Sequence, residues 1–195
     1  MTRAAAGLAL AMTALAACSG GDPAPPQTSA PMPSTTTSTT TSTPPTTSAT
    51  SAGPAFPAGL PDAAKTKDKA GAEAFAGYFA RQLNKSWTEA DPTLIPILCN
   101  LPTSRSCTGF VEVATDLRTK KHRYDGAPLS VNEVRASVVS GGLQWVDIQG
   151  IQEKRNIVDT TGNVVSTDLR KPLTLVVQLK WTSKGWNAYD VKTGS

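Results

Sequence analysis

The order of apolar and polar positions divides the chain into three parts. An apolar run covers residues 4–17, close to the N-terminus. Residues 23–61 are rich in Ser, Thr, Pro and Ala and contain no charged residue. Only from Asp62 onward do apolar residues recur at the spacings that helices and strands require. The pattern therefore predicts an N-terminal segment, a linker and one folded domain over residues 62–195.

The first half of the domain has the pattern of helices. Within residues 67–89, four large apolar residues recur at four-residue intervals: Phe75, Phe79, Leu83 and Trp87. This spacing places them on one face of a helix. Asp91-Pro92 is typical of a helix start and predicts a short helical turn. A further helix is expected after the loop between the cysteines, capped by Ser106 or Thr108.

The second half has the pattern of strands. Residues 129–140 are β-rich and end at Gly141-Gly142, a hairpin signal. A second strand is expected within residues 143–159, broken or bulged around Gly150. Residues 173–181 alternate between apolar and mostly polar positions, and a last strand follows over residues 186–192. Helices followed by four hairpin-linked antiparallel strands predict an α+β fold.

The end of the N-terminal apolar run carries the most informative motif. Leu15-Ala16-Ala17-Cys18 resembles the lipobox of bacterial lipoproteins, in which the cysteine takes a diacylglycerol and becomes the new N-terminus. The run is too short to cross a hydrocarbon core, which needs roughly 20 helical residues. We therefore expect residues 1–17 to be a removed signal peptide and Cys18 to be lipidated. The alternative is an ordinary secretory signal cut near Ala16 or Ala17, with Cys18 unmodified.

Lipidation would hold the chain at the outer face of the cell membrane, with residues 18–61 as the lipidated cysteine and a tether. Its uncharged Ser/Thr/Pro composition offers nothing to bury, so we expect it to be disordered. Such tracts can also carry O-linked sugars.

The cysteine count fits this arrangement. Once Cys18 is lipidated, Cys99 and Cys107 remain as an even pair, and an extracytoplasmic compartment is oxidising enough for them to form a disulfide. The polar loop between them suits a surface crosslink. Zinc binding is the alternative, but two cysteines without paired histidines fall short of a zinc site. We expect no metal.

Charge and motifs limit the function classes. The net charge of +4 is mild and, with the export signal, argues against nucleic-acid binding. His122 lies in a basic run that suits a helix C-terminus, although the run could also contact phosphate or lipid. Tyr78 with Asp91 or Asp147 could supply the hydrogen-bond donor and carboxylate of an isomerase, but cap and surface roles suit these aspartates better. With no phosphate loop or nucleophile elbow in the sequence, we expect no catalytic residue and no cofactor.

Three stretches together resemble a known family. They are Ala72–Phe79, the cysteine pair in Leu98-Cys99 and Ser106-Cys107, and the ending Val177–Trp181 with Gly185-Trp186. The chain is similar to an actinobacterial lipoprotein family of unknown function, although its cysteine spacing is longer. The resemblance implies a cone-shaped domain like nuclear transport factor 2 and the cystatin-like superfamily. In such a domain, N-terminal helices pack on a curved four-stranded antiparallel sheet, and a pocket can form at the open end.

Two functions remain at this stage. The first is a non-catalytic module that binds a cell-envelope protein, a wall polymer or an apolar ligand, with the membrane contacted through the anchor. The alternative is a small isomerase- or cyclase-like enzyme acting on a small apolar substrate. A buried carboxylate facing a tyrosine would favour the enzyme, whereas a pocket filled by tryptophans would favour the module. The candidate pocket residues are aromatic and also suit a core: Tyr78, Trp87, Trp145 and Trp181.

Overall fold

The computed structural model describes residues 56–194, so the predicted signal peptide, Cys18 and most of the predicted tether lie outside the described residues. A 3-10 turn, η1 (Asp62–Lys65), precedes helices α1 (Lys69–Thr88) and α2 (Arg105–Lys120). The strands that follow are β1 (Arg123–Tyr124), β2 (Leu129–Ser140), β3 (Leu143–Gln152), β4 (Arg155–Val158), β5 (Val164–Asp168), β6 (Lys171–Thr182) and β7 (Gly185–Gly194). No helix within residues 56–194 is long and apolar enough to span a membrane.

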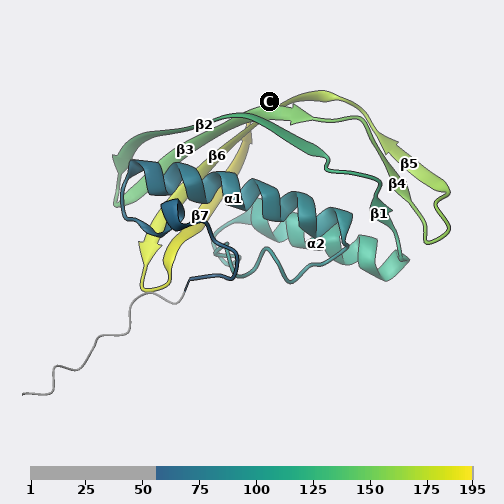
Figure 1. The fold of residues 1–195 in the computed structure, drawn as a ribbon, viewed down its shortest axis with the longest axis horizontal. Coiled ribbons are helices and arrows are strands. Elements are labelled where there is room, and N and C mark those ends of the chain that lie inside the picture. The colour runs from purple at the N-terminus through teal and green to yellow at the C-terminus, as the bar shows by residue number, and fades with distance from the viewer. Residues whose placement is uncertain (1–55, 195) are drawn as a thin grey trace, which may run out of the picture. The chain divides into compact units, whose positions relative to one another are not determined.

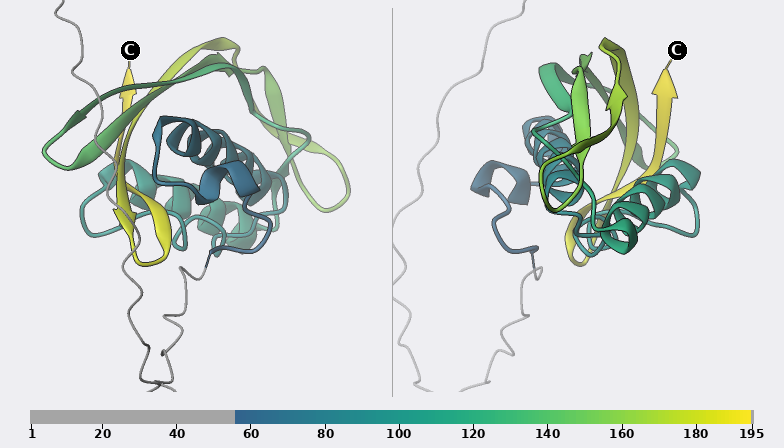
Figure 2. Two further views of the ribbon diagram at one scale, coloured as in Figure 1. Left: turned by 60° about the vertical axis from the view of Figure 1, so that its left-hand side comes forward. Right: turned by 90° about the vertical axis from the view of Figure 1, so that its right-hand side faces the viewer.

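The main sheet has the order β2-β3-β6-β7 and is antiparallel throughout. Its strands arch over α1, and α2 packs beside α1 and against β7 (Figures 1 and 2). The predicted α+β arrangement, with helices on the concave side of a curved four-stranded sheet, is confirmed.

The core lies between α1 and the concave face of this sheet. Phe75, Phe79 and Leu83 of the predicted helical stripe are fully buried, and Trp87 is 9% exposed. From the sheet they meet alternate residues of the two central strands: Val146 and Ile148 of β3, and Leu175, Val177 and Leu179 of β6. The apolar face of the predicted helix therefore packs against the apolar face of the predicted strands in one layer.

A second, smaller sheet with the order β1-β4-β5 was not predicted. The strand expected over residues 143–159 is divided, since β3 ends at Gln152 and β4 begins at Arg155. The irregularity expected around Gly150 is present as a register shift in the β2–β3 pairing, where Val131 and Glu133 oppose Gly150 and Gln149. Gly150 itself lies where a Cβ would collide with the Ser130 carbonyl oxygen. β5 is exposed along most of its length, so its residues show no buried face that could have indicated a strand.

The disulfide between Cys99 and Cys107 is confirmed, with the two Cα atoms 6.3 Å apart. Both cysteines are buried, not on the surface as expected, because Cys99 bridges Ala188 of β7 and Cys107 lies in the first turn of α2. That helix begins earlier than predicted. Its cap is Ser104, while Ser106 and Thr108, the expected caps, lie inside it.

Residues that the sequence assigned to the end of the tether contact the domain. The Tyr78 hydroxyl donates to the Ala58 carbonyl oxygen at 2.9 Å, and Leu60 is buried. Phe56 packs partly buried against the core near Gly185, at the β6–β7 turn. Among the described residues, contacts with the domain therefore begin before Asp62.

Candidate functional site

A cavity of about 720 Å³ opens where the main sheet meets the small sheet. Its volume falls in the range of about 300–1,000 Å³ that is usual for small-molecule sites. The lining comes from both helices, from both sheets and from the loop before β2: Leu83, Trp87, Phe110, Val113, Tyr124, Pro128, Leu129, Gln152, Asp168, Lys171, Pro172, Leu173, Leu175, Thr193 and Gly194.

Three aromatic rings form one wall. The Trp87 ring lies edge-on to Phe110 with centroids 5.8 Å apart, and 6.1 Å from Tyr124. The indole nitrogen of Trp87 donates to the Phe110 carbonyl oxygen at 3.2 Å, so its polar atom is satisfied within the wall. This wall offers a ligand an apolar surface that is already held in place.

A polar cluster interrupts the apolar lining at the junction of the sheets. The Tyr124 hydroxyl donates to Asp168 Oδ2 at 2.6 Å, and Gln152 Nε2 donates to the same oxygen at 3.3 Å. Burial, and next the hydrogen bond to Asp168, raise the pKa of Tyr124 well above its usual value. Tyr124 is therefore a neutral donor committed to Asp168, which is itself half-buried.

Strand ends bring this cluster together. Gln152 ends β3, Asp168 ends β5, and Lys171 begins β6 opposite Gln152. Tyr124 comes from β1, which pairs with β4. Tyr124 and Asp168 could not be predicted as site residues because their small-sheet strands show no pattern in the sequence, and Gln152 becomes part of the site only through its bond to Asp168. The aromatic Tyr124 within a charged stretch was the one available signal.

The structure does not bring the four candidate pocket residues together. Of these, Trp87 alone lines the cavity. Tyr78 faces Ala58, and Trp181 lies edge-to-face on Trp186, 5.1 Å between centroids, in a separate hollow of about 450 Å³. Trp145 lies on the convex face under the Lys192 amine, because alternation along β3 turns its neighbours Val146 and Ile148 inward.

The other candidate groups have local roles. Asp91 Oδ1 accepts from the Thr93 hydroxyl and amide, which lowers the pKa of Asp91. Asp147 is the register partner of Arg135 across β2 and β3, and the Arg135 guanidinium bonds to Glu133. Neither aspartate takes the isomerase-like role with Tyr78 that the sequence left open, because the Tyr78 hydroxyl donates to the Ala58 carbonyl oxygen.

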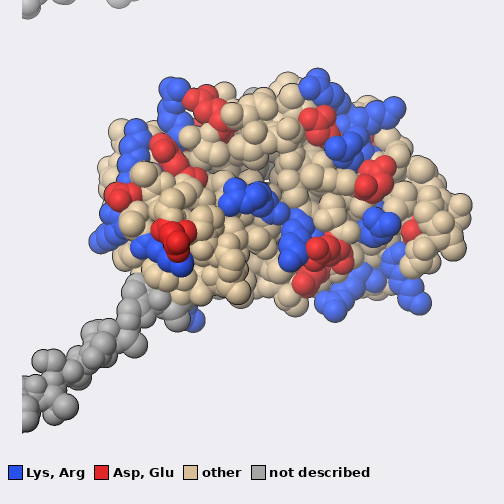
Figure 3. Space-filling view, viewed as in Figure 1, with Lys and Arg blue, Asp and Glu red and all other residues tan. Residues whose placement is uncertain are grey.

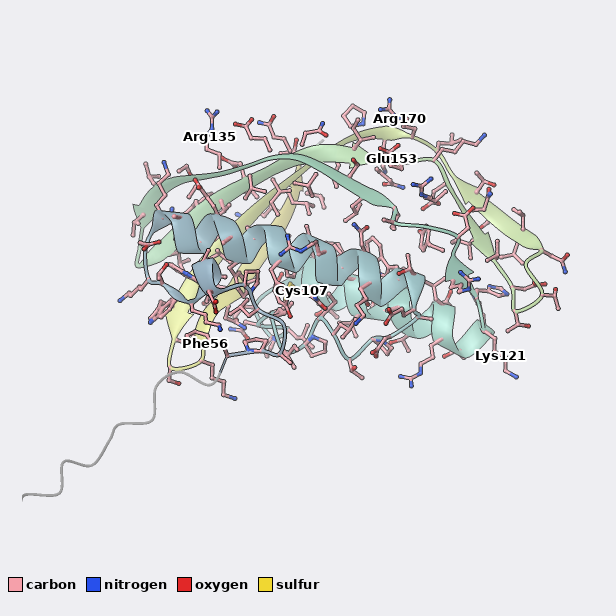
Figure 4. The ribbon with its side chains drawn as sticks, viewed as in Figure 1. Phe56, Cys107, Lys121, Arg135, Glu153 and Arg170 are labelled. Carbon is pink, nitrogen blue, oxygen red and sulfur yellow. A yellow bond between two sulfur atoms is a disulfide. The ribbon has the colours of Figure 1, made fainter. Side chains whose placement is uncertain are left out.

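The basic run around His122 shares its hollow with acidic residues. Arg118, Lys121, His122 and Arg123 line this hollow together with Glu89, Asp91 and Asp159. Lys121 lies at the end of α2 (Figure 4), where it adopts the left-handed conformation that ends the helix. The mixed charge makes the hollow a poor anion site. Within the part of the chain described, no group of His, Cys, Asp and Glu side chains could hold a metal ion.

No family model matches the sequence, and no curated protein matches it. Among solved structures, the intermembrane space region of the chloroplast protein ARC6 aligns with a TM-score of 0.50 at 16% identity, covering 66% of this chain and 97% of that one. An uncharacterized protein with a cystatin-like fold from Caulobacter vibrioides gives 0.40 at 14% identity, covering 60% of this chain and 84% of that one. A variant of Rd1NTF2_05 gives 0.34 at 11% identity, covering 61% and 96%. At these identities the likeness concerns the fold alone.

Proposed function

We propose that this chain is a cell-envelope lipoprotein of the actinobacterial family that its sequence resembles, and that its domain binds a small, mostly apolar ligand without transforming it. The cavity at the junction of the two sheets is the observation that carries this proposal. Sites for small molecules combine apolar walls with a few placed polar groups. Here the walls are Trp87, Phe110 and Leu173, and the polar groups gather around Asp168.

The location outside the cytoplasm rests on two features. The lipobox-like Leu15–Cys18 predicts export and lipid anchoring. The buried Cys99–Cys107 disulfide fits an oxidising compartment.

A small cone-fold enzyme is the second candidate, because a carboxylate does face a tyrosine in the cavity. Tyr124 and Asp168 lie 2.6 Å apart, oxygen to oxygen. A general acid is most effective when its pKa lies near the working pH, whereas the pKa of Tyr124 moves further above it. The Tyr124 proton also points to Asp168, which makes the pair a better anchor for the cavity wall than a catalyst. A substrate whose turnover is lost in Asp168→Asn, with binding retained, would favour the enzyme.

A neutral fluorescent probe tests the binding site directly. We expect N-phenyl-1-naphthylamine to bind the purified full chain with one saturable site. Val113→Trp should weaken this binding by about tenfold or more, because Val113 lines the cavity and a larger ring fills it. Val113 is 40% exposed, so α2 can accept the change.

The matched control is Val138→Trp, because Val138 is 69% exposed on β2 and outside the cavity. Its probe affinity should equal that of the unchanged chain. Absence of saturable binding, or equal affinities in the two variants, would contradict the proposed site.

A further inference from the structure

The charged side chains around the cavity differ in whether they already have a bonded partner. Lys171 opens β6 and lies on the same face as Leu173 and Leu175, which also line the cavity. Its register partner on β3 is the amide side chain Gln152, not an acid. Among residues 56–194, no carboxylate oxygen lies within 4.0 Å of the Lys171 ammonium.

The nearby acids already have partners. Asp168, the acid in the lining, accepts hydrogen bonds from Tyr124 and Gln152 on one oxygen. Glu153 forms an ion pair with Arg170 at 3.4 Å, and both stand above the junction of the sheets (Figure 4). On the face of the molecule that Figure 3 shows, basic and acidic residues are interspersed. The Lys171 ammonium is thus the cation that the cavity leaves available to a bound molecule.

We infer that the ligand is an anionic single-chain amphiphile, with its apolar part against the Trp87 wall and its acid group on Lys171 at the mouth. This inference rests on the proposed function. Lys171 is exposed and lies at the rim of an apolar wall, so it favours a ligand that brings both an apolar body and a negative charge. Since Asp168 is held by two donors, it competes for the lysine less than a free carboxylate would.

Three amphiphiles with one tail and different heads test the inference. Dodecanoate, dodecanol and dodecylammonium are titrated, below micelle formation, into the full chain carrying N-phenyl-1-naphthylamine. Dodecanoate should displace the probe at about two- to fivefold lower concentration than dodecanol, the range expected for one exposed charge pair. Lys171→Gln should remove this preference, and Lys171→Arg should keep it.

Lys184→Gln is the control, because Lys184 lies at the β6–β7 turn, in another hollow. The preference for dodecanoate should survive in this variant. Equal displacement by dodecanoate and dodecanol, or tighter binding of dodecylammonium, would overturn the anionic head while leaving the binding site in place. Failure of all three to displace a bound probe would overturn the inference as well. Absence of probe binding itself would remove the proposed function.

Discussion

Ser104 shows how much one small polar side chain can hold in this domain. It is fully buried, and its hydroxyl oxygen accepts from the Cys107 amide at 3.3 Å and from the Val191 amide at 3.1 Å. The first bond caps α2, and the second is shared by a β7 amide that also donates to Asp190 Oδ1 at 2.9 Å. One hydroxyl therefore ties the start of a helix to the last strand.

Removing this hydroxyl should destabilise the folded domain. We expect Ser104→Ala to lower the free energy of unfolding by about 1–2 kcal/mol, since it removes the α2 cap and one of the two hydrogen bonds of the Val191 amide, which also donates to Asp190 Oδ1 at 2.9 Å. Ser106→Ala, at one of the two positions that the sequence offered as the cap, should change it by less than about 0.5 kcal/mol. Urea unfolding of the two variants measures both values, and equal losses would contradict the role of Ser104.

The segment around Cys99 joins β7 to α2. The Asn100 amide donates to the Ala188 carbonyl, and the Ala188 amide donates to the Leu98 carbonyl, both at 2.8 Å. These bonds cover the outer edge of β7, which would otherwise expose unpaired backbone groups. The disulfide then fastens this covering segment to α2.

Loss of the disulfide should loosen this edge. We expect Cys99→Ala with Cys107→Ala to lower the free energy of unfolding by about 2.5 kcal/mol, the value for a closed loop of this length. Hydrogen exchange should rise at the β7 amides more than in the middle of α1. Reduction of the unchanged chain serves as the control and should give a similar loss. Unchanged stability after both treatments would count against a structural role for the bond.

At the scale of the whole molecule, the predicted anchor and the cavity lie in different parts of the chain. Phe56, the first described residue, packs near the β6–β7 turn (Figure 4), whereas the cavity opens where the two sheets meet. The proposed ligand site is therefore separate from the point where the tether meets the domain.

The lipid anchor has a direct test. We expect the full chain to fractionate with membranes when expressed in a bacterium that processes lipoproteins, and Cys18→Ala to remove it from that fraction, because the acyl groups have no other attachment point. Cys107→Ala should remain with the membranes. Intact mass of the extracted protein should show residues 1–17 removed and a diacylglyceryl or triacyl cysteine. A mature form that is released to the medium and starts elsewhere would contradict the prediction.

Local periodicity accounts for the parts of the fold that the sequence predicts well. The four-residue spacing of Phe75, Phe79, Leu83 and Trp87 recurs as the buried face of α1. The alternation from Leu173 to Trp181 recurs in β6, and Gly141-Gly142 forms the turn between β2 and β3. Each pattern repeats within one element that buries one face, so it can be recognised in the sequence without knowing which element packs against it.

The site depends on contacts that no such pattern records. Tyr124 and Asp168 are 44 residues apart and meet because two short strands pair through β4. These strands are too short and too exposed to show a period. The burial of Ser104 likewise depends on a strand that begins 81 residues later. Burial within an element can be read along the chain, but a cavity formed by strand ends exists only once distant segments have packed together.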